Sequence, residues 1–254
     1  MWPLAGAFAL TALVYASVGF GGGSTYNALL VLADTDYRLL PAIALLCNLI
    51  VVTGGTIRFA RAGQVPWRPL WPILLLSAPC AWAGGRLPVD KALFIALLGF
   101  ALLLAGLLML AQREQREAHG RAAVASPRLP WIGVPIGMAV GFFSGIVGIG
   151  GGIFLAPILH LLRWSSARQI AASASVFILV NSLAGLVGQL MKQDAAATPM
   201  AISSYWPLFA AVLVGGQLGS HIGARILPQK LIRIGTAVLI LYVAAQLLWQ
   251  RFGG

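Results

Sequence analysis

Eight apolar segments follow one another along this chain, and they constrain its fold more than any other feature. Most of them approach the roughly 20 residues that an α-helix needs to cross the hydrocarbon core of a bilayer. Only 9% of the 254 residues are charged, against roughly 25% in a soluble domain. A water-facing surface cannot be built from so few charges, so the sequence predicts an all-α, polytopic membrane protein. The segments run over residues 2–33, 39–59, 69–87, 91–111, 130–162, 169–191, 204–226 and 231–250.

The first and fifth segments are longer than one membrane helix, and each contains a glycine cluster. GFGGGSTYNALL occupies residues 19–30, and GIGGGIFLAPIL occupies residues 148–159. Glycine weakens a helix by about 1 kcal/mol relative to alanine. We therefore expect both segments to be broken or re-entrant at these clusters. The glycines that match between them are Gly19, Gly21, Gly22 and Gly23 in the first, and Gly148, Gly150, Gly151 and Gly152 in the fifth.

The rest of the chain also divides into two matching halves. Gly55 in the second segment matches Gly185 in the sixth, and Arg86 of AGGRLP matches Arg225 of GARILP. One sizeable polar stretch, QREQREAHGRAAVASPR, separates the halves. We expect a first repeat of four segments at 1–111, a linker at 112–129 and a second repeat at 130–254. Internal repeats of this kind are a common organisation of secondary transporters.

The Lys and Arg residues predict the path of the fifth segment. If all eight segments cross the membrane, the 17 basic residues divide nine against eight between the two sides. If the fifth segment enters and returns, twelve lie on the side of the linker and five on the other. Cytoplasmic loops carry an excess of Lys and Arg, so the second path is favoured. By repeat symmetry the first segment is re-entrant too, which inverts the halves relative to each other and places both termini outside.

The residues that follow each glycine cluster form a predicted anion-binding site. Irregular backbone at membrane depth persists only when it is buried in protein or lines a wet cavity. A half-helix that starts there presents free N–H groups and the positive end of the helix dipole, which together attract an anion. The predicted backbone contributors are Gly21, Gly22, Gly23 and Ser24 from the first half, and Gly150, Gly151, Gly152 and Ile153 from the second.

Polar side chains inside the segments supply further candidates for this site. They gather beside the first break and in the matching second and sixth segments, which favours a shared polar cavity. Hydrogen bonding between helices is the alternative role for each. No Asp or Glu falls within a segment, so a carboxylate relay or cation site inside the membrane is not expected, and the net charge of +11 suits an anion. The predicted side-chain contacts are Thr25, Asn27, Asn48, Ser173 and Asn181.

Other functions are less consistent with the residues. An intramembrane serine hydrolase could use Ser24 with His221, but Ser24 lacks a Gly-x-Ser-x-Gly frame and Ile153 takes its place in the second half. The sequence does not distinguish a passive anion channel from a transporter. The basic residues are scattered singly, which argues against a nucleic-acid partner. No cofactor is expected, because no Lys-Ser/Thr follows the glycines as in a nucleotide site.

A stripe of four glycines in the fifth segment predicts close helix packing. Gly133, Gly137, Gly141 and Gly145 repeat at every fourth residue and so lie on one helix face. The stripe fits a contact within the chain or a contact between two copies of the chain equally well.

The two glycine motifs and the paired elements AGGRLP and GARILP resemble the sulfite exporter TauE/SafE family of transmembrane permeases, over essentially the whole chain. The second motif, with Pro157 after its glycines, is the closer match, because the first has Ala28 at that position. The resemblance implies a multi-pass permease of the bacterial inner membrane. It implies as substrate a small organosulfur or sulfur oxyanion, such as sulfite or a sulfonate.

Overall fold

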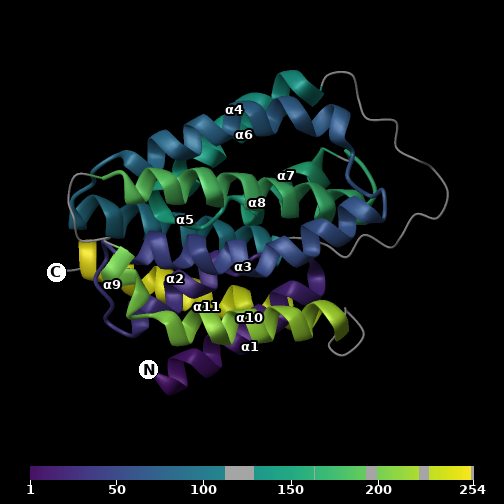
Figure 1. Ribbon diagram of the computed structural model, residues 1–254. Helices are drawn as coiled ribbons and strands as arrows, with labels where there is room; N and C mark the ends of the chain where they lie inside the picture. The colour runs from purple at the N-terminus through teal and green to yellow at the C-terminus, as the bar shows by residue number, and fades with distance from the viewer. Residues whose placement is uncertain (112–128, 163, 193–198, 223–228, 253–254) are drawn as a thin grey trace.

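The computed structural model describes residues 1–111, 129–162, 164–192, 199–222 and 229–252. All regular structure in these residues is α-helical (Figure 1). The helices are α1 (Trp2–Val18), α2 (Gly23–Leu32), α3 (Leu40–Arg61), α4 (Trp67–Arg86), α5 (Lys91–Ala111), α6 (Leu129–Val147), α7 (Gly152–Leu161), α8 (Ala167–Leu190), α9 (Pro199–Ser203), α10 (Trp206–Ile222) and α11 (Gln229–Phe252).

The predicted segments correspond to these helices, and both long segments are broken at their glycines. The first segment is α1 followed by α2, and the fifth is α6 followed by α7. The short helix α9 was not predicted, because five residues are too few to produce a periodic pattern. The predicted linker, apart from residue 129, and residues 223–226 of the seventh segment lie outside the described residues.

Three of the described helices are long and apolar enough to cross a membrane by length and composition: Leu40–Arg61, Lys91–Ala111 and Arg168–Leu190. Shorter apolar helices span Trp2–Ser17, Ile132–Val147, Trp206–Ser220 and Ala237–Gln250. The apolar stretches of α3 and α8 are 67% buried, whereas that of α5 is 33% buried. Helices α3 and α8 therefore form the centre of the bundle, while α5 lies at its outside.

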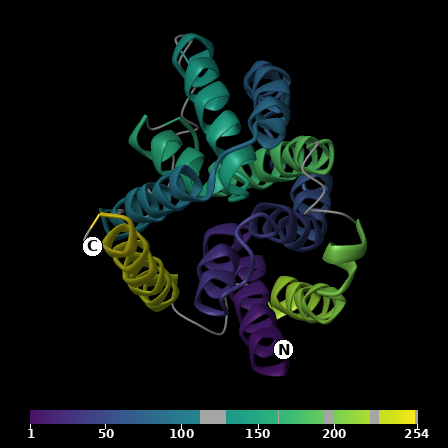
Figure 2. The same ribbon diagram turned by 90° about the vertical axis from the view of Figure 1, so that its left-hand side faces the viewer.

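Helix α2 turns back toward the end of the bundle at which α1 begins (Figure 1). The ring of Phe8 stacks on that of Tyr26 at 4.8 Å between centroids, and the hydroxyl of Tyr15 hydrogen-bonds that of Thr25 at 3.0 Å. Residues in the middle and toward the end of α1 thus meet residues in the first turn of α2, as in a hairpin. Figure 2 views the end of the molecule at which α1 begins and α11 ends. Helix α5 ends, and α6 begins, toward the opposite end (Figure 1).

The helices pack in pairs that correspond between the two parts of the chain. Helix α1 lies along α10, and α6 lies along α4 in the same way. Helix α5 packs against α11, and α3 packs against α8. Each helix of the first part has a counterpart about 130 residues later in the chain. When every helix is replaced by its counterpart, the same set of packed pairs results.

Glycines allow the two helices of each pair, α4–α6 and α1–α10, to pack with their backbones in contact. A Cβ atom added to Gly145 of α6 would overlap the carbonyl oxygen of Ala81, and one added to Gly219 of α10 would overlap that of Leu13. The glycine stripe of α6 therefore serves a contact within the chain. Small residues at such positions let membrane helices gain van der Waals contact, since lipid tails provide no hydrophobic drive between helices.

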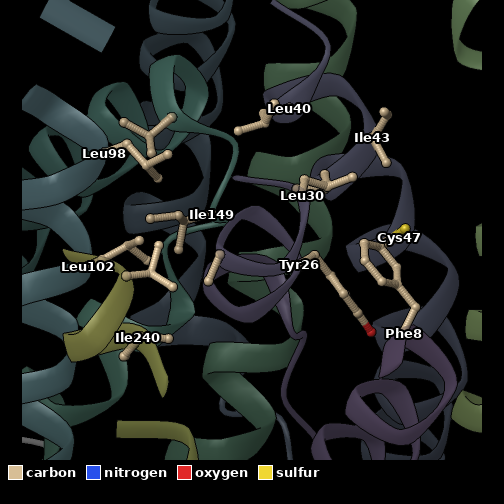
Figure 3. Close-up of a cluster of buried hydrophobic side chains, with 14 of the residues drawn as sticks. Phe8, Tyr26, Leu30, Leu40, Ile43, Cys47, Leu98, Leu102, Ile149 and Ile240 are labelled. Atoms are coloured by element: carbon tan, nitrogen blue, oxygen red, sulfur yellow. The ribbon is translucent and has the colours of Figure 1, made fainter. Parts of the chain in front are cut away.

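Buried apolar side chains fill the space around the breaks, and apolar side chains also cover the outside. Figure 3 shows Phe8 and Tyr26 beside Leu30 and Cys47, all of them fully buried. At the surface, Trp2 is 79% exposed and Trp249 is 75% exposed. Exposed large apolar side chains of this kind, distributed over most helices, match a surface in contact with lipid.

We expect Gly145→Ala and Gly219→Ala each to lower the melting temperature of the purified protein in detergent. Overpacking by one methyl group costs about 1–3 kcal/mol, which corresponds to about 2–10 °C for a chain of this size. Gly6→Ala is the matched control, because a Cβ atom at Gly6 of α1 meets nothing within 4 Å. Its melting temperature should stay unchanged or rise. Equal losses in all three variants would contradict the packing described.

Candidate functional site

The first break lies between Val18 and Gly23. Helix α1 ends with Gly19 in the left-handed region (φ 85°), and α2 begins at Gly23 after Gly22 as its N-cap. No side chain caps this N-terminus. The first four N–H groups of a helix have no acceptor within the helix. The start of α2 therefore presents uncapped donors deep inside the bundle, where Gly22, Gly23 and Ser24 are buried.

The second break, between Val147 and Gly152, has a more unusual backbone. Gly148, Gly150 and Gly151 have φ values of 81°, 83° and 77°, and Gly151 is the N-cap of α7 without a side-chain cap. Side chains strongly disfavour this region, so glycine is needed at these positions for conformation. The first break has only Gly19 in this region, so its other glycines serve a different purpose.

Gly23 serves contact with the second break, because the two breaks pack directly against each other. A Cβ atom added to Gly23 would overlap the carbonyl oxygen of Ile149. Two asparagines from the first half bind carbonyls of the second: Asn27 Nδ2 donates to Val147 O at 3.0 Å, and Asn48 Nδ2 donates to Ile149 O at 3.0 Å. Carbonyls that the second break removes from a helix ladder thus regain donors from the first half.

Asn48 of α3 lies between the breaks. A Cβ atom on Gly21 would come within 2.5 Å of its Oδ1, and one on Gly150 within 2.7 Å of its Nδ2. The side chain is fully buried, and Oδ1 has no hydrogen-bond partner. An unpartnered buried carbonyl oxygen costs about 1–3 kcal/mol. Asn48 therefore carries an unsatisfied polar atom at a point where both breaks meet.

Both breaks follow α3 along its length. Gly148 contacts Pro41 at the start of α3, Gly150 and Gly23 contact Asn48, and Gly19 contacts Phe59 near its end. At 1.5 Å per residue, the helix from Pro41 to Phe59 spans about 27 Å. That length is close to the roughly 30 Å of a bilayer's hydrocarbon core. Glycines of the two breaks thus lie along α3 from Pro41 to Phe59, with the side chain of Asn48 between the breaks.

The remaining predicted residues lie at different distances from this centre. Ser24 and Thr25 are buried in the first turn of α2, where Thr25 pairs with Tyr15, and Ile153 is partly buried at the start of α7. Ser173 donates to the carbonyl of Gln169 in its own helix. Asn181 Nδ2 donates to Ser77 Oγ at 3.0 Å and to Phe177 O at 2.9 Å. The amide of Asn181 therefore faces α4 rather than the breaks.

The sequence-based prediction did not single out Ser182, which does lie at the second break. Its Oγ is 2.9 Å from the position of a Cβ on Gly150, and it is buried without a hydrogen-bond partner. Ser182 lies one helical turn after Ile178, which also contacts Gly150. The available signal in the sequence was a polar side chain inside an apolar segment, next to Asn181. A second polar contact between the halves joins Thr56 Oγ1 and Ser175 Oγ at 2.8 Å.

Titratable groups are scarce around the breaks. In the parts of the chain that the structure describes, no three His, Cys, Asp or Glu residues gather as metal ligands would. The side chain of His221, the predicted partner of Ser24 in the hydrolase alternative, lies outside the described residues. What the centre offers is amide and hydroxyl groups together with two uncapped helix N-termini.

We expect Gly23→Ala to lower the melting temperature by about 2–10 °C, because the new methyl group must push the first break away from Ile149. Gly216→Ala is the matched control, since its Cβ would make ordinary contact at 3.6 Å with Val51. If Gly23→Ala and Gly216→Ala have the same melting temperature, the breaks do not pack as described.

Comparison with known proteins places the chain in a family. The profile described as Sulfite exporter TauE/SafE matches residues 4–247. A probable membrane transporter protein of Sinorhizobium fredii is 34% identical over 249 residues, which cover 97% of each chain. Another from Methanocaldococcus jannaschii is 26% identical, covering 84% of this chain and 82% of its own. YunE of Bacillus subtilis, named likewise, is 24% identical over 92% of each chain.

No solved structure matches the chain significantly. The family match over nearly the whole chain and the apolar helices agree with a multi-pass bacterial membrane protein of transporter type. This chain belongs to the sulfite exporter TauE/SafE family.

Proposed function

We propose that the protein is a secondary transporter for a small organosulfur or sulfur oxyanion, such as sulfite or a sulfonate, which binds where the two glycine breaks meet. One observation carries this proposal: two uncapped half-helix N-termini lie in two breaks that pack on each other beside Asn48. The printed description of the family supports the choice of a sulfur oxyanion.

The chemistry of the centre suits an anion. A helix N-terminus carries the equivalent of about half a positive charge, and its free N–H groups donate to anionic oxygens. The backbone of 21–24 and 150–153 would supply these donors, with the amide groups of Asn27 and Asn48 beside them. A carboxylate would repel such a ligand, and the described residues place none among the contacts of the breaks.

We further propose that the chain consists of two inverted repeats, 1–111 and 130–254, joined by a linker. The corresponding helix pairs, α1 on α10 and α6 on α4, support it. Each repeat then contains a re-entrant pair and three crossing helices, an odd number, which inverts one repeat relative to the other. The positive-inside rule assigns the end at which α5 finishes to the cytoplasm.

The direct contact between the breaks indicates how transport would proceed. Gly23 and Ile149 leave no room between them even for a methyl group. A substrate can therefore bind there only when one half moves against the other, as alternating access requires. During that motion the amide of Asn48 would exchange the carbonyl of Ile149 for an oxygen of the anion. A permanently open pore does not fit this packing.

The test is uptake of radiolabelled sulfite, and separately of a small sulfonate, into proteoliposomes. The wild-type protein should give saturable flux. Asn48→Leu and Asn48→Asp should each lower kcat/KM by about 10- to 100-fold, because a hydrogen bond to a charged group contributes about 1.5–3 kcal/mol. Gly216→Ala, which lies on α10 away from the breaks, should transport normally.

The aspartate variant makes the test specific for charge. It keeps the shape of Asn48 but adds a negative charge, so it should impair an anion transporter at least as much as leucine does. Sulfite flux that is unimpaired or faster in Asn48→Asp would show that the anion does not bind beside Asn48, and it would overturn the proposal. Flux that does not saturate, together with single-channel currents, would identify a passive channel instead. Melting curves confirm that each variant is folded.

A further inference from the structure

Ser182 of α8 carries a hydroxyl group that has no hydrogen-bond partner among the described residues. The side chain is fully buried, and its Oγ is unpaired. A serine inside a helix can donate to the carbonyl one turn earlier, and Ser173 of the same helix does so, to Gln169 O at 2.7 Å. A buried hydroxyl without a partner is destabilising. The stability of the fold therefore does not explain the presence of Ser182.

The hydroxyl of Ser182 and the amide of Asn48 converge on the second break. A Cβ atom built on Gly150 would lie 2.9 Å from Ser182 Oγ and 2.7 Å from Asn48 Nδ2. Gly150 directly precedes Gly151, the N-cap of α7. In the described part of the chain, no backbone hydrogen bond starts from the N–H of Gly150 or Gly151. Two side-chain donors and free backbone donors therefore lie close together at the start of α7.

The surroundings of the two breaks correspond, but the polar and apolar positions are exchanged between them. A Cβ atom on Gly21 of the first break would contact Asn48 and Val52 of α3. One on the matching glycine of the second break would contact Ile178 and Ser182 of α8, which lie 130 positions after them. The polar residue thus comes first in α3 and second in α8. Each half therefore contributes one polar and one apolar side chain to the centre.

The amide of Asn48 makes the two breaks unequal for an anion. Its Oδ1 faces Gly21, whereas its Nδ2 is close to both Gly23 and Gly150. The hydrogen bond from Nδ2 to Ile149 O, at 3.0 Å, fixes this orientation. A carbonyl oxygen repels an anion, and an N–H group donates to it. The neighbourhood of Gly150 is therefore more favourable for an anion than that of Gly21.

We infer that Ser182 binds the transported oxyanion, and that the second break, beside Gly150, holds the oxygens of the anion. The hydroxyl of Ser182 and the N–H groups at the start of α7 belong to the same half of the chain, and α7 packs against α8. They stay together when the halves separate, and the amide of Asn48 completes the site from the other half. The inference rests on the proposed function, since it assigns a further donor and a position within the same site.

The experiment compares Ser182→Ala with the wild-type protein in the proteoliposome assay with radiolabelled sulfite. We expect Ser182→Ala to raise KM by about 10-fold or more and to change kcat less, because the variant loses a hydrogen bond to a charged ligand. Ser17→Ala is the matched control: Ser17 is partly buried in α1, but its hydroxyl already donates to Val14 O at 2.7 Å. The control should transport as the wild-type protein does.

An unchanged KM in Ser182→Ala, or an equal increase in Ser17→Ala, would overturn the inference while leaving the proposed transport intact. Absence of saturable flux in the wild type would instead overturn the proposed function.

Melting temperatures of the purified protein in detergent separate binding from a structural role. Without sulfite, Ser182→Ala should melt at the wild-type temperature or above it, because the substitution removes a buried hydroxyl that has no partner. Sulfite should raise the melting temperature of the wild type, and the variant should need about 10-fold more sulfite for the same rise. A lower melting temperature without sulfite, together with an unchanged response to sulfite, would show that Ser182 supports the fold and does not bind the anion.

A second substitution tests which break holds the anion. Val52→Ser places a hydroxyl group at the matching position beside the first break. Added to Ser182→Ala, it should leave KM raised, because the amide of Asn48 presents its oxygen on that side. Recovery of the wild-type KM in this double variant would show that either break can hold the anion, and it would overturn the assignment to the second break.

Discussion

The structure depends on how backbone groups freed at membrane depth find partners. Each glycine break removes N–H and C=O groups from a helix ladder, and hydrocarbon offers them nothing in exchange. The carbonyls of Val147 and Ile149 regain donors from Asn27 and Asn48, which belong to the other half of the chain. These two bonds hold the broken segments in contact with each other in this structure.

The same contact defines what can move. Glycines let α1 approach α10 and α6 approach α4 at backbone distance, so the first helix of each broken segment packs against a helix from the other half of the chain. Between the breaks the contact is equally tight, but two asparagine amides make its polar bonds, and Asn48 Oδ1 lacks a partner. Under the proposed function, a bound anion takes the place of the Ile149 carbonyl as acceptor for the amide N–H of Asn48.

The sequence predicted much of this arrangement. The lengths of the apolar runs placed the helices, and the twinned glycine clusters placed both breaks. Asn27 and Asn48 were selected because polar side chains gather beside the first break and in the matching second and sixth segments, and both do contact the second break. Asn181 was selected for the same reason, yet its amide faces Ser77. Ser182 at the break was not singled out, since the choice between neighbouring positions depends on the rotation of α8.

By itself, the sequence determined that the chain is an all-helical membrane protein and where its long segments break. Composition and periodicity are local properties, and each can be read from a single segment. Only the tertiary structure decided that the breaks meet beside Asn48 and that the amides of Asn27 and Asn48 bind carbonyls of the second half. Those contacts join residues about 100 or more positions apart. Their geometry follows from how whole helices pack, which no single segment encodes.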